Sequence, residues 1–198
     1  MAAIIVLKKD MLPDLKRILR PSGWLDILTY IQFPFFFITL HLWRNDLALT
    51  ELLWRYLLLT FGYVIAIYDI LHKEVPNSYI LALLAAWVVI SIPQLFIQIG
   101  PSLKYLFDSL FGFLIGGGLF LLVYIISKKG LGGGDVKYMA VAGLYLGMNG
   151  VLAAIFFTLV FSVITGWALI LLKRIGRKDT LPFAPFLYIG FLAAVFIL

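Results

Sequence analysis

The sequence contains no cysteine, and this absence removes several classes of chemistry. A chain of 198 residues without cysteine has no disulfide framework, no thiol nucleophile and no cysteine-ligated metal. Charge is also scarce, because Asp, Glu, Lys and Arg together make up only 13% of the residues, and the acidic ones number 10. An acidic side chain within an apolar stretch is therefore a rare feature of this chain.

Apolar residues are what the chain has in abundance. They make up 63% of the sequence and the mean hydropathy is +1.05, whereas a soluble domain is only about half apolar. Several apolar runs reach roughly 20 residues, the length that spans about 30 Å of hydrocarbon as a helix. We therefore expect an all-α polytopic protein whose partner is the lipid bilayer. The net charge of +6 fits basic loops facing an anionic leaflet and requires no nucleic acid.

The apolar segments follow one another with short connections. Residues 1–23 are expected to form a cytoplasmic or interfacial lead-in, because their lysines follow the first apolar residues instead of preceding them as in a cleavable signal. The predicted segments are 24–43, 52–71, 79–99, 105–126, 134–149, 151–172 and 183–198.

The fifth segment decides the predicted topology because it is short. Its apolar part, 136–147, would be about 18 Å long as a helix, too little to cross alone. If it does cross, 13 of the 16 lysines and arginines lie on the cytoplasmic side, whereas otherwise the split is 9 against 7. The positive-inside rule favours crossing. The sequence thus predicts about seven transmembrane helices, with the N-terminus in the cytoplasm and the C-terminus outside.

Three consecutive glycines, Gly132 to Gly134, run directly into Asp135 at the start of this short segment. Glycine permits sharp turns and close backbone approach. Irregular backbone at membrane depth is tolerated only where protein or water covers it. Asp135 would occupy the first turn of a helix, where negative charge is favoured. Taken alone, the stretch is more typical of a tight turn than of a functional site.

A second acidic residue changes this interpretation. Asp69 lies about one turn before the cytoplasmic end of the second segment, so the predicted topology places it at the same level as Asp135. An ionisable residue inside a spanning segment is by default a functional-site hypothesis. Asp108 and Arg55 also lie in apolar segments, but near their ends, where we expect them to act as interfacial anchors.

Three motifs occur in order: "DILHKEVPN" from Asp69, "GGGDVK" around Asp135 and "LPFAPFLYIG" near the end. Over roughly residues 60–198, the chain resembles the type IV prepilin peptidases, which are polytopic aspartic proteases of the GxGD class. The resemblance implies that Asp69 and Asp135 are the catalytic pair. It also implies a six-helix protease domain at 52–198, preceded by an extra helix and outer loop at 24–51. Other motif residues that it implies near the site are Gly132, Gly133, Gly134, Lys137, Pro76, Asn77, Pro182 and Pro185.

The same resemblance implies an endopeptidase of the cytoplasmic (inner) cell membrane. It would remove the short basic leader of prepilin-like precursors, such as type IV pilins, archaellins or pseudopilins, at the cytoplasmic face. Hydrolysis by two carboxyl groups needs one ionised group to activate water and one protonated group to donate to the carbonyl oxygen. Two such groups close together share a proton. No cofactor is implied. Which aspartate is the base, which precursor is cut and which oligomer forms stay open.

Many bacterial members of this family carry a cytoplasmic domain with paired cysteines between their first helices, linked to N-methylation of the mature pilin. Here only residues 45–51 separate the first two segments, which puts N-methyltransferase activity in doubt and suggests a peptidase-only form. His41 and His72 are the only histidines and fall on opposite sides of the predicted membrane, so we expect no metal site.

Two other functions remain open. One is an intramembrane protease of the presenilin or signal peptide peptidase type, whose YD and GxGD motifs are compatible with this sequence but whose Pro-Ala-Leu motif is absent. The other is a small transporter that couples to protons through its two acidic residues. A transporter would more often carry a carboxylate at the membrane midplane or show repeated halves.

Overall fold

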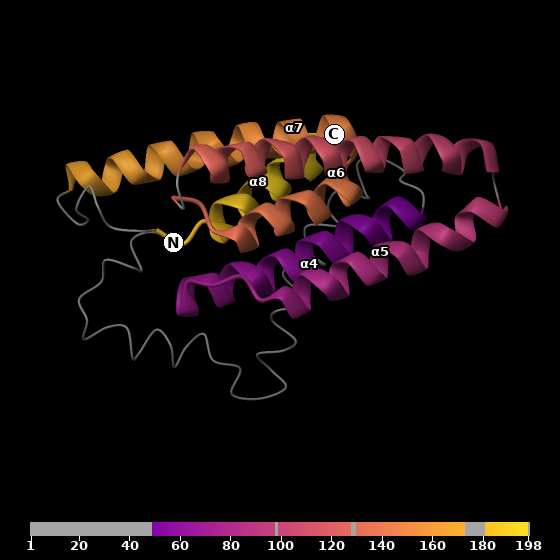
Figure 1. Ribbon diagram of the computed structural model, residues 1–198, viewed down its shortest axis with the longest axis horizontal. Coiled ribbons are helices and arrows are strands. Elements are labelled where there is room, and N and C mark those ends of the chain that lie inside the picture. The colour runs from indigo at the N-terminus through magenta and orange to yellow at the C-terminus, as the bar shows by residue number, and fades with distance from the viewer. Residues whose placement is uncertain (1–48, 98, 128–129, 173–180, 198) are drawn as a thin grey trace.

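The computed structural model describes residues 49–97, 99–127, 130–172 and 181–197, and these residues form a bundle of helices without strands (Figure 1). The all-α class expected from the composition is therefore confirmed for this part of the chain. The helices are α4 (Leu49–His72), α5 (Asn77–Ile97), α6 (Ile99–Ile126), α7 (Gly133–Leu171) and α8 (Ala184–Ile197).

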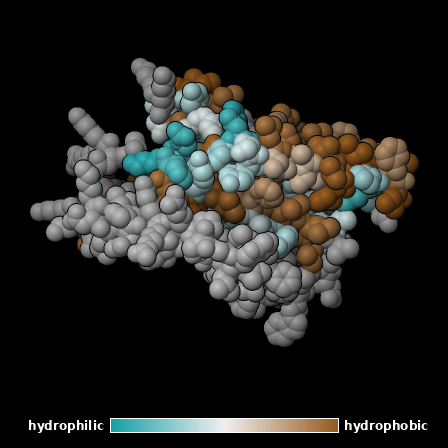
Figure 2. Space-filling model, turned by 90° about the horizontal axis from the view of Figure 1, so that it is seen from below, coloured by the Kyte–Doolittle hydropathy of each residue, from teal (hydrophilic) through white to brown (hydrophobic). Residues whose placement is uncertain are grey.

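Four of these helices, α4 to α7, are long and apolar enough to cross a membrane. Large apolar side chains such as Phe96 and Trp167 are exposed on their outer faces. In Figure 2, apolar residues cover most of the part of the surface that is coloured, and hydrophilic residues gather toward the end of the bundle where α4 ends. An apolar surface of this extent is unfavourable in water and suits lipid. The chain is a multi-pass membrane protein.

The expected count of about seven helices is not supported, because the described residues form five. The predicted segment 24–43 lies outside the described residues. The predicted segments 134–149 and 151–172 both lie within α7, which is interrupted close to the boundary between them. The expected orientation of the two termini relative to the membrane stays a prediction.

The long helix α7 is interrupted at Gly147, whose φ of 67° and ψ of −175° are not helical. This region of backbone conformation is open almost only to glycine. Gly116 of α6 lies against both Met139, before the break, and Val151, after it. Twelve residues of straight helix would separate these two by about 18 Å. The chain therefore folds back at Gly147, and α7 consists of a short segment, 133–146, and a longer one, 148–171 (Figure 1).

Asp108 of α6 holds this reversal. Its carboxylate accepts a hydrogen bond of 3.2 Å from the Met148 amide and lies against Gly147. An acidic side chain that accepts from a free amide at the start of a helical segment satisfies a donor that has no partner within the helix. Asp108 thus does more than the interfacial anchoring expected of it.

The core lies where α4, α7 and α8 meet. Leu58 and Leu59 of α4 and Tyr138 of α7 are fully buried, and the Tyr138 ring packs edge-on against Phe191 of α8. On the other side, α6 packs closely on the short segment of α7, because Gly112 and Gly143 bring the two backbones into contact. Both short elements, α8 and the first part of α7, are thus held by packing against the longer helices.

Candidate active site

The structure places Asp69 in the last turn of α4, with 5% of the residue exposed. Its Oδ2 accepts a hydrogen bond of 2.9 Å from the backbone amide of Ala184, and the Phe183 amide interacts with the same carboxylate. These amides belong to the start of α8, 115 positions along the chain. A buried carboxylate requires such donors, because leaving it without them costs a large desolvation penalty.

The start of α8 explains why this bond forms. The first amides of a helix have no partner within the helix. The amide of Phe186 and that of the next residue donate to the Phe183 carbonyl, and Pro185 has no amide hydrogen. The Ala184 amide is the one left over, and Asp69 accepts from it. The negative carboxylate also lies at the helix end where such charge is favoured.

Asp135 is the third residue of α7, and 7% of it is exposed. The helix is capped by Gly132, whose backbone is extended (φ −74°, ψ 140°), and the Asp135 carboxylate accepts a backbone hydrogen bond from that glycine. This is one half of a capping box, in which an acidic third residue bonds back to the capping amide; the other half is absent because glycine has no side chain. The other oxygen, Oδ1, is buried and has no partner among the described residues.

The three glycines before Asp135 differ in how much room they have. A Cβ at Gly132 would lie 2.9 Å from Asp135 Oδ2, and a Cβ at Gly134 would lie 2.9 Å from Val75 Cβ and 3.3 Å from the Val75 carbonyl oxygen. A Cβ at Gly133 would meet no atom within 4 Å. Asp135 approaches Gly132 closely and Val75 approaches Gly134 closely, so a side chain is disfavoured at these two positions but not at Gly133. This is the pattern written GxGD.

The two carboxylates line one cavity of about 300 Å³ at the end of the bundle where α4 ends and α7 begins. They lie close enough for the charge of Asp69 to act on Asp135. The rest of the lining consists of Lys73, Glu74, Val75 and the glycines 132–134. A cavity of this size holds several waters or a short stretch of extended peptide, and it presents two carboxyl groups to either.

The remaining residues named from the sequence lie around this cavity without lining its described wall. Asn77 begins α5 directly after Pro76, and its Oδ1 accepts a hydrogen bond of 3.2 Å from Lys137 Nζ. This bond connects α5 to the helix that carries Asp135. Pro182 and Pro185 are buried on either side of Ala184 and shape the turn that aims its amide at Asp69.

Three contributions to the site were not found from the sequence. They are the backbone amide of Ala184, the Val75 contact with Gly134, and Lys73, whose positive φ of 57° ends α4 and turns the chain along the cavity. The motif "LPFAPF" marked a helix start, but nothing in it indicated which carboxylate would accept the free amide. A Cβ-bearing residue with positive φ likewise has no reliable sequence signal.

The site offers few ligands for a metal ion. Within the part of the chain that the structure describes, no group of three or more His, Cys, Asp or Glu side chains is placed to bind one. The cavity presents two carboxyl groups, those of Asp69 and Asp135. In peptide hydrolysis, an ionised carboxylate takes a proton from water as the water attacks, while a protonated carboxyl group donates to the carbonyl oxygen.

Comparison with known proteins identifies a family for most of the described part of the chain. Residues 56–171 match the model of the type IV leader peptidase family. No solved structure matches the chain.

Curated relatives agree with the family match. A prepilin leader peptidase/N-methyltransferase of Bacillus subtilis is 35% identical over 138 residues, which cover 66% of this chain and 50% of that protein. Proteins of the same description from Pseudomonas aeruginosa and Xanthomonas campestris are 28% and 27% identical. Their matches cover 68% and 62% of this chain, and 46% and 42% of those proteins. The chain thus spans about half the length of the curated relatives it matches.

Proposed function

The chain belongs to the type IV leader peptidase family, and from this premise we propose that it is a membrane-embedded aspartic endopeptidase that uses Asp69 and Asp135. Its substrates would be prepilin-like precursors, from which it removes the leader at the cytoplasmic face of the membrane. The observation that carries the proposal is that two buried carboxyl groups, 66 positions apart in sequence, line the same open cavity.

The surroundings of the two aspartates differ, which suits different roles for their carboxyl groups in hydrolysis. Asp69 is held by backbone amides at the start of α8, so its orientation is set by the fold. Asp135 also lines the cavity, and its buried Oδ1 has no partner among the described residues, so its carboxyl group is less completely held by the fold than that of Asp69. Hydrolysis proceeds as water adds to the peptide carbon, one carboxylate accepts the water proton, and the other carboxyl group donates a proton to the carbonyl oxygen. The amine then leaves with the proton taken from water.

The cavity suits an extended peptide. The backbone at Gly133 faces open space, so a substrate chain can pass close to the residue before the dyad without meeting a side chain. The hydrophilic end of the bundle provides the water that the reaction consumes. A site at one end of the bundle, with apolar helices extending away from it, also suits a substrate whose cleaved bond adjoins an apolar helix.

The proposal covers the peptidase activity alone. The printed names of the relatives include N-methyltransferase, but the match covers about half of each of them. We propose that the chain cleaves without methylating, in keeping with its lack of cysteine. Incubating the cleaved product with a labelled methyl donor tests this separately: incorporation of label that depends on this chain would contradict it.

The decisive experiment is cleavage of a model prepilin in membranes that contain the full chain. Asp69→Asn and Asp135→Asn should each lower cleavage by at least about 10²-fold, the lower limit of what a general acid or base contributes. The matched control is Asp108→Asn, which changes a carboxylate at the other end of the bundle and keeps an oxygen for the Met148 amide. It should cleave like the wild type.

The outcomes distinguish the functions that the sequence left open. Cleavage retained in either dyad variant would remove Asp69 and Asp135 from the mechanism. Proton-coupled solute uptake by the wild type, with no cleavage of any precursor, would favour the transporter. Cleavage inside the apolar helix of a substrate, and not at its leader, would favour the presenilin-like alternative.

A further inference from the structure

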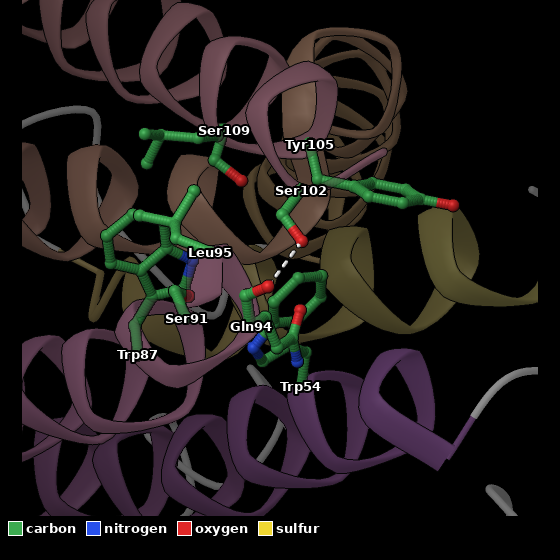
Figure 3. A pocket seen from close by; sticks show the side chains of 9 residues that line it. Trp54, Trp87, Ser91, Gln94, Leu95, Ser102, Tyr105 and Ser109 are labelled. Carbon is green, nitrogen blue, oxygen red and sulfur yellow. Dashed lines mark hydrogen bonds between the residues drawn. The ribbon is translucent and has the colours of Figure 1, made fainter. Parts of the chain in front are cut away.

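A second, smaller cavity lies at the end of the bundle opposite the two aspartates, between α4, α5 and α6 (Figure 3). Its volume is about 10 Å³, roughly the space that a single water molecule requires. Trp54 reaches it from α4, and Ser91 and Gln94 reach it from α5. No residue of the proposed peptidase site takes part in it.

Three polar atoms in this cavity are buried and have no partner among the described residues: Trp54 Nε1, Ser91 Oγ and Gln94 Nε2. Two other polar groups of the same wall are satisfied. The Trp87 indole donates to the Leu144 carbonyl at 3.1 Å, and the Ser102 hydroxyl donates to the Gln94 carbonyl at 2.9 Å, as Figure 3 shows for the latter. The unpartnered atoms all belong to residues that line this cavity.

The chemistry of these atoms specifies what must join them. Trp54 Nε1 and Gln94 Nε2 are both donor atoms, so with the Gln94 amide in this orientation they cannot satisfy each other. The group between them must accept two hydrogen bonds. Water has two lone pairs to accept with and two protons to donate, and buried waters typically make about three hydrogen bonds to groups of this kind.

We propose that this cavity is a binding site for one buried water, which accepts from Trp54 Nε1 and Gln94 Nε2 and donates to Ser91 Oγ. The water links α4 to α5 at the level of Pro93, which lies between Ser91 and Gln94. Proline has no amide to donate, so the helix lacks one of its own hydrogen bonds there. A bridge to α4 compensates by holding this turn of α5 in place.

Nuclear magnetic resonance of the full chain in lipid nanodiscs, with ¹⁵N-labelled indoles, tests the proposal directly. The Trp54 signal is assigned by its loss in Trp54→Phe. Its indole proton should show a cross-peak to a long-lived water. Trp87 serves as the internal control, because it lines the same cavity but donates to a backbone carbonyl and should show no such cross-peak.

A double variant, Ser91→Ala with Gln94→Leu, removes two of the three partners of the water. It should abolish the cross-peak at Trp54 and shift that resonance, while the unchanged Trp87 resonance reports that the fold persists. Two results would overturn the proposal. One is a wild-type Trp54 proton without any water cross-peak, as in a dry cavity or in a direct bond to a rotated Gln94 amide. The other is a cross-peak that persists in the double variant.

Discussion

Alanine substitutions at Gly133 and Gly134 should have opposite effects on stability, although they are the same change at adjacent residues. A methyl group at position 134 would lie 2.9 Å from Val75 Cβ, whereas one at position 133 would meet nothing within 4 Å. Unbonded carbon atoms rest about 3.5–4.0 Å apart, so Val75 would have to move by roughly 0.6–1.1 Å.

The free energies follow from these contacts. Overpacking of this kind costs about 1–3 kcal/mol. Replacing glycine by alanine within a helix gains roughly 0.5–1 kcal/mol because the unfolded chain has less entropy to lose. The net effect of Gly134→Ala should therefore be a destabilisation of up to about 2.5 kcal/mol, whereas Gly133→Ala should stabilise the protein by up to about 1 kcal/mol.

The effect on cleavage should follow the same division. Displacing a catalytic group by about 1 Å can cost about 10²-fold in rate. Gly134→Ala should lower the cleavage rate because it shifts Val75 and the start of α7. Gly132→Ala should lower the cleavage rate because its methyl group displaces the Asp135 carboxylate directly. Gly133→Ala should keep the wild-type kcat, and any change should appear in KM because the added methyl group faces the cavity.

The assay combines thermal unfolding in nanodiscs with steady-state cleavage of a model prepilin by the same preparations. The three single variants and the wild type form one series. If Gly133→Ala proved as unstable and as inactive as Gly134→Ala, then close packing would not be the reason for these glycines. A general need for backbone flexibility would explain them better.

Two further substitutions test the surrounding architecture. Gly147→Ala should destabilise the protein by about 1–3 kcal/mol, because alanine is strained at φ 67° and its Cβ would press on Asp108. The control is Gly118→Ala, because nothing lies within 4 Å of a Cβ at that position. Equal unfolding midpoints for the two variants would contradict the folded-back α7. A double-mutant cycle of Lys137→Met and Asn77→Ala should give a coupling free energy of about 0.5–1.5 kcal/mol in thermal unfolding, as for an ordinary hydrogen bond. Purely additive effects of the two substitutions would show that the hydrogen bond between Lys137 and Asn77 does not stabilise the fold.

Much of the local structure could be predicted from the sequence. Apolar runs located the membrane helices, and proline and glycine located their ends: α5 begins right after Pro76, and α7 begins at Gly133. These features depend on neighbours within a few residues, so a local pattern contains them. The predicted boundary between 134–149 and 151–172 also fell close to Gly147, where α7 turns back. Nevertheless, the helix count expected from such runs exceeded the five that the structure describes.

By itself the sequence determined that the chain is a helical membrane protein and that two rare acidic residues, Asp69 and Asp135, end and begin helices. It did so because apolar run length, and the cost of a charge in an apolar segment, depend on composition and order alone. Only the tertiary structure decided that both carboxylates line one cavity, that Asp69 accepts the Ala184 amide, and that Gly132 and Gly134 are constrained while Gly133 is free. Most of these are contacts between segments far apart in the chain, and their atoms meet only when the helices pack.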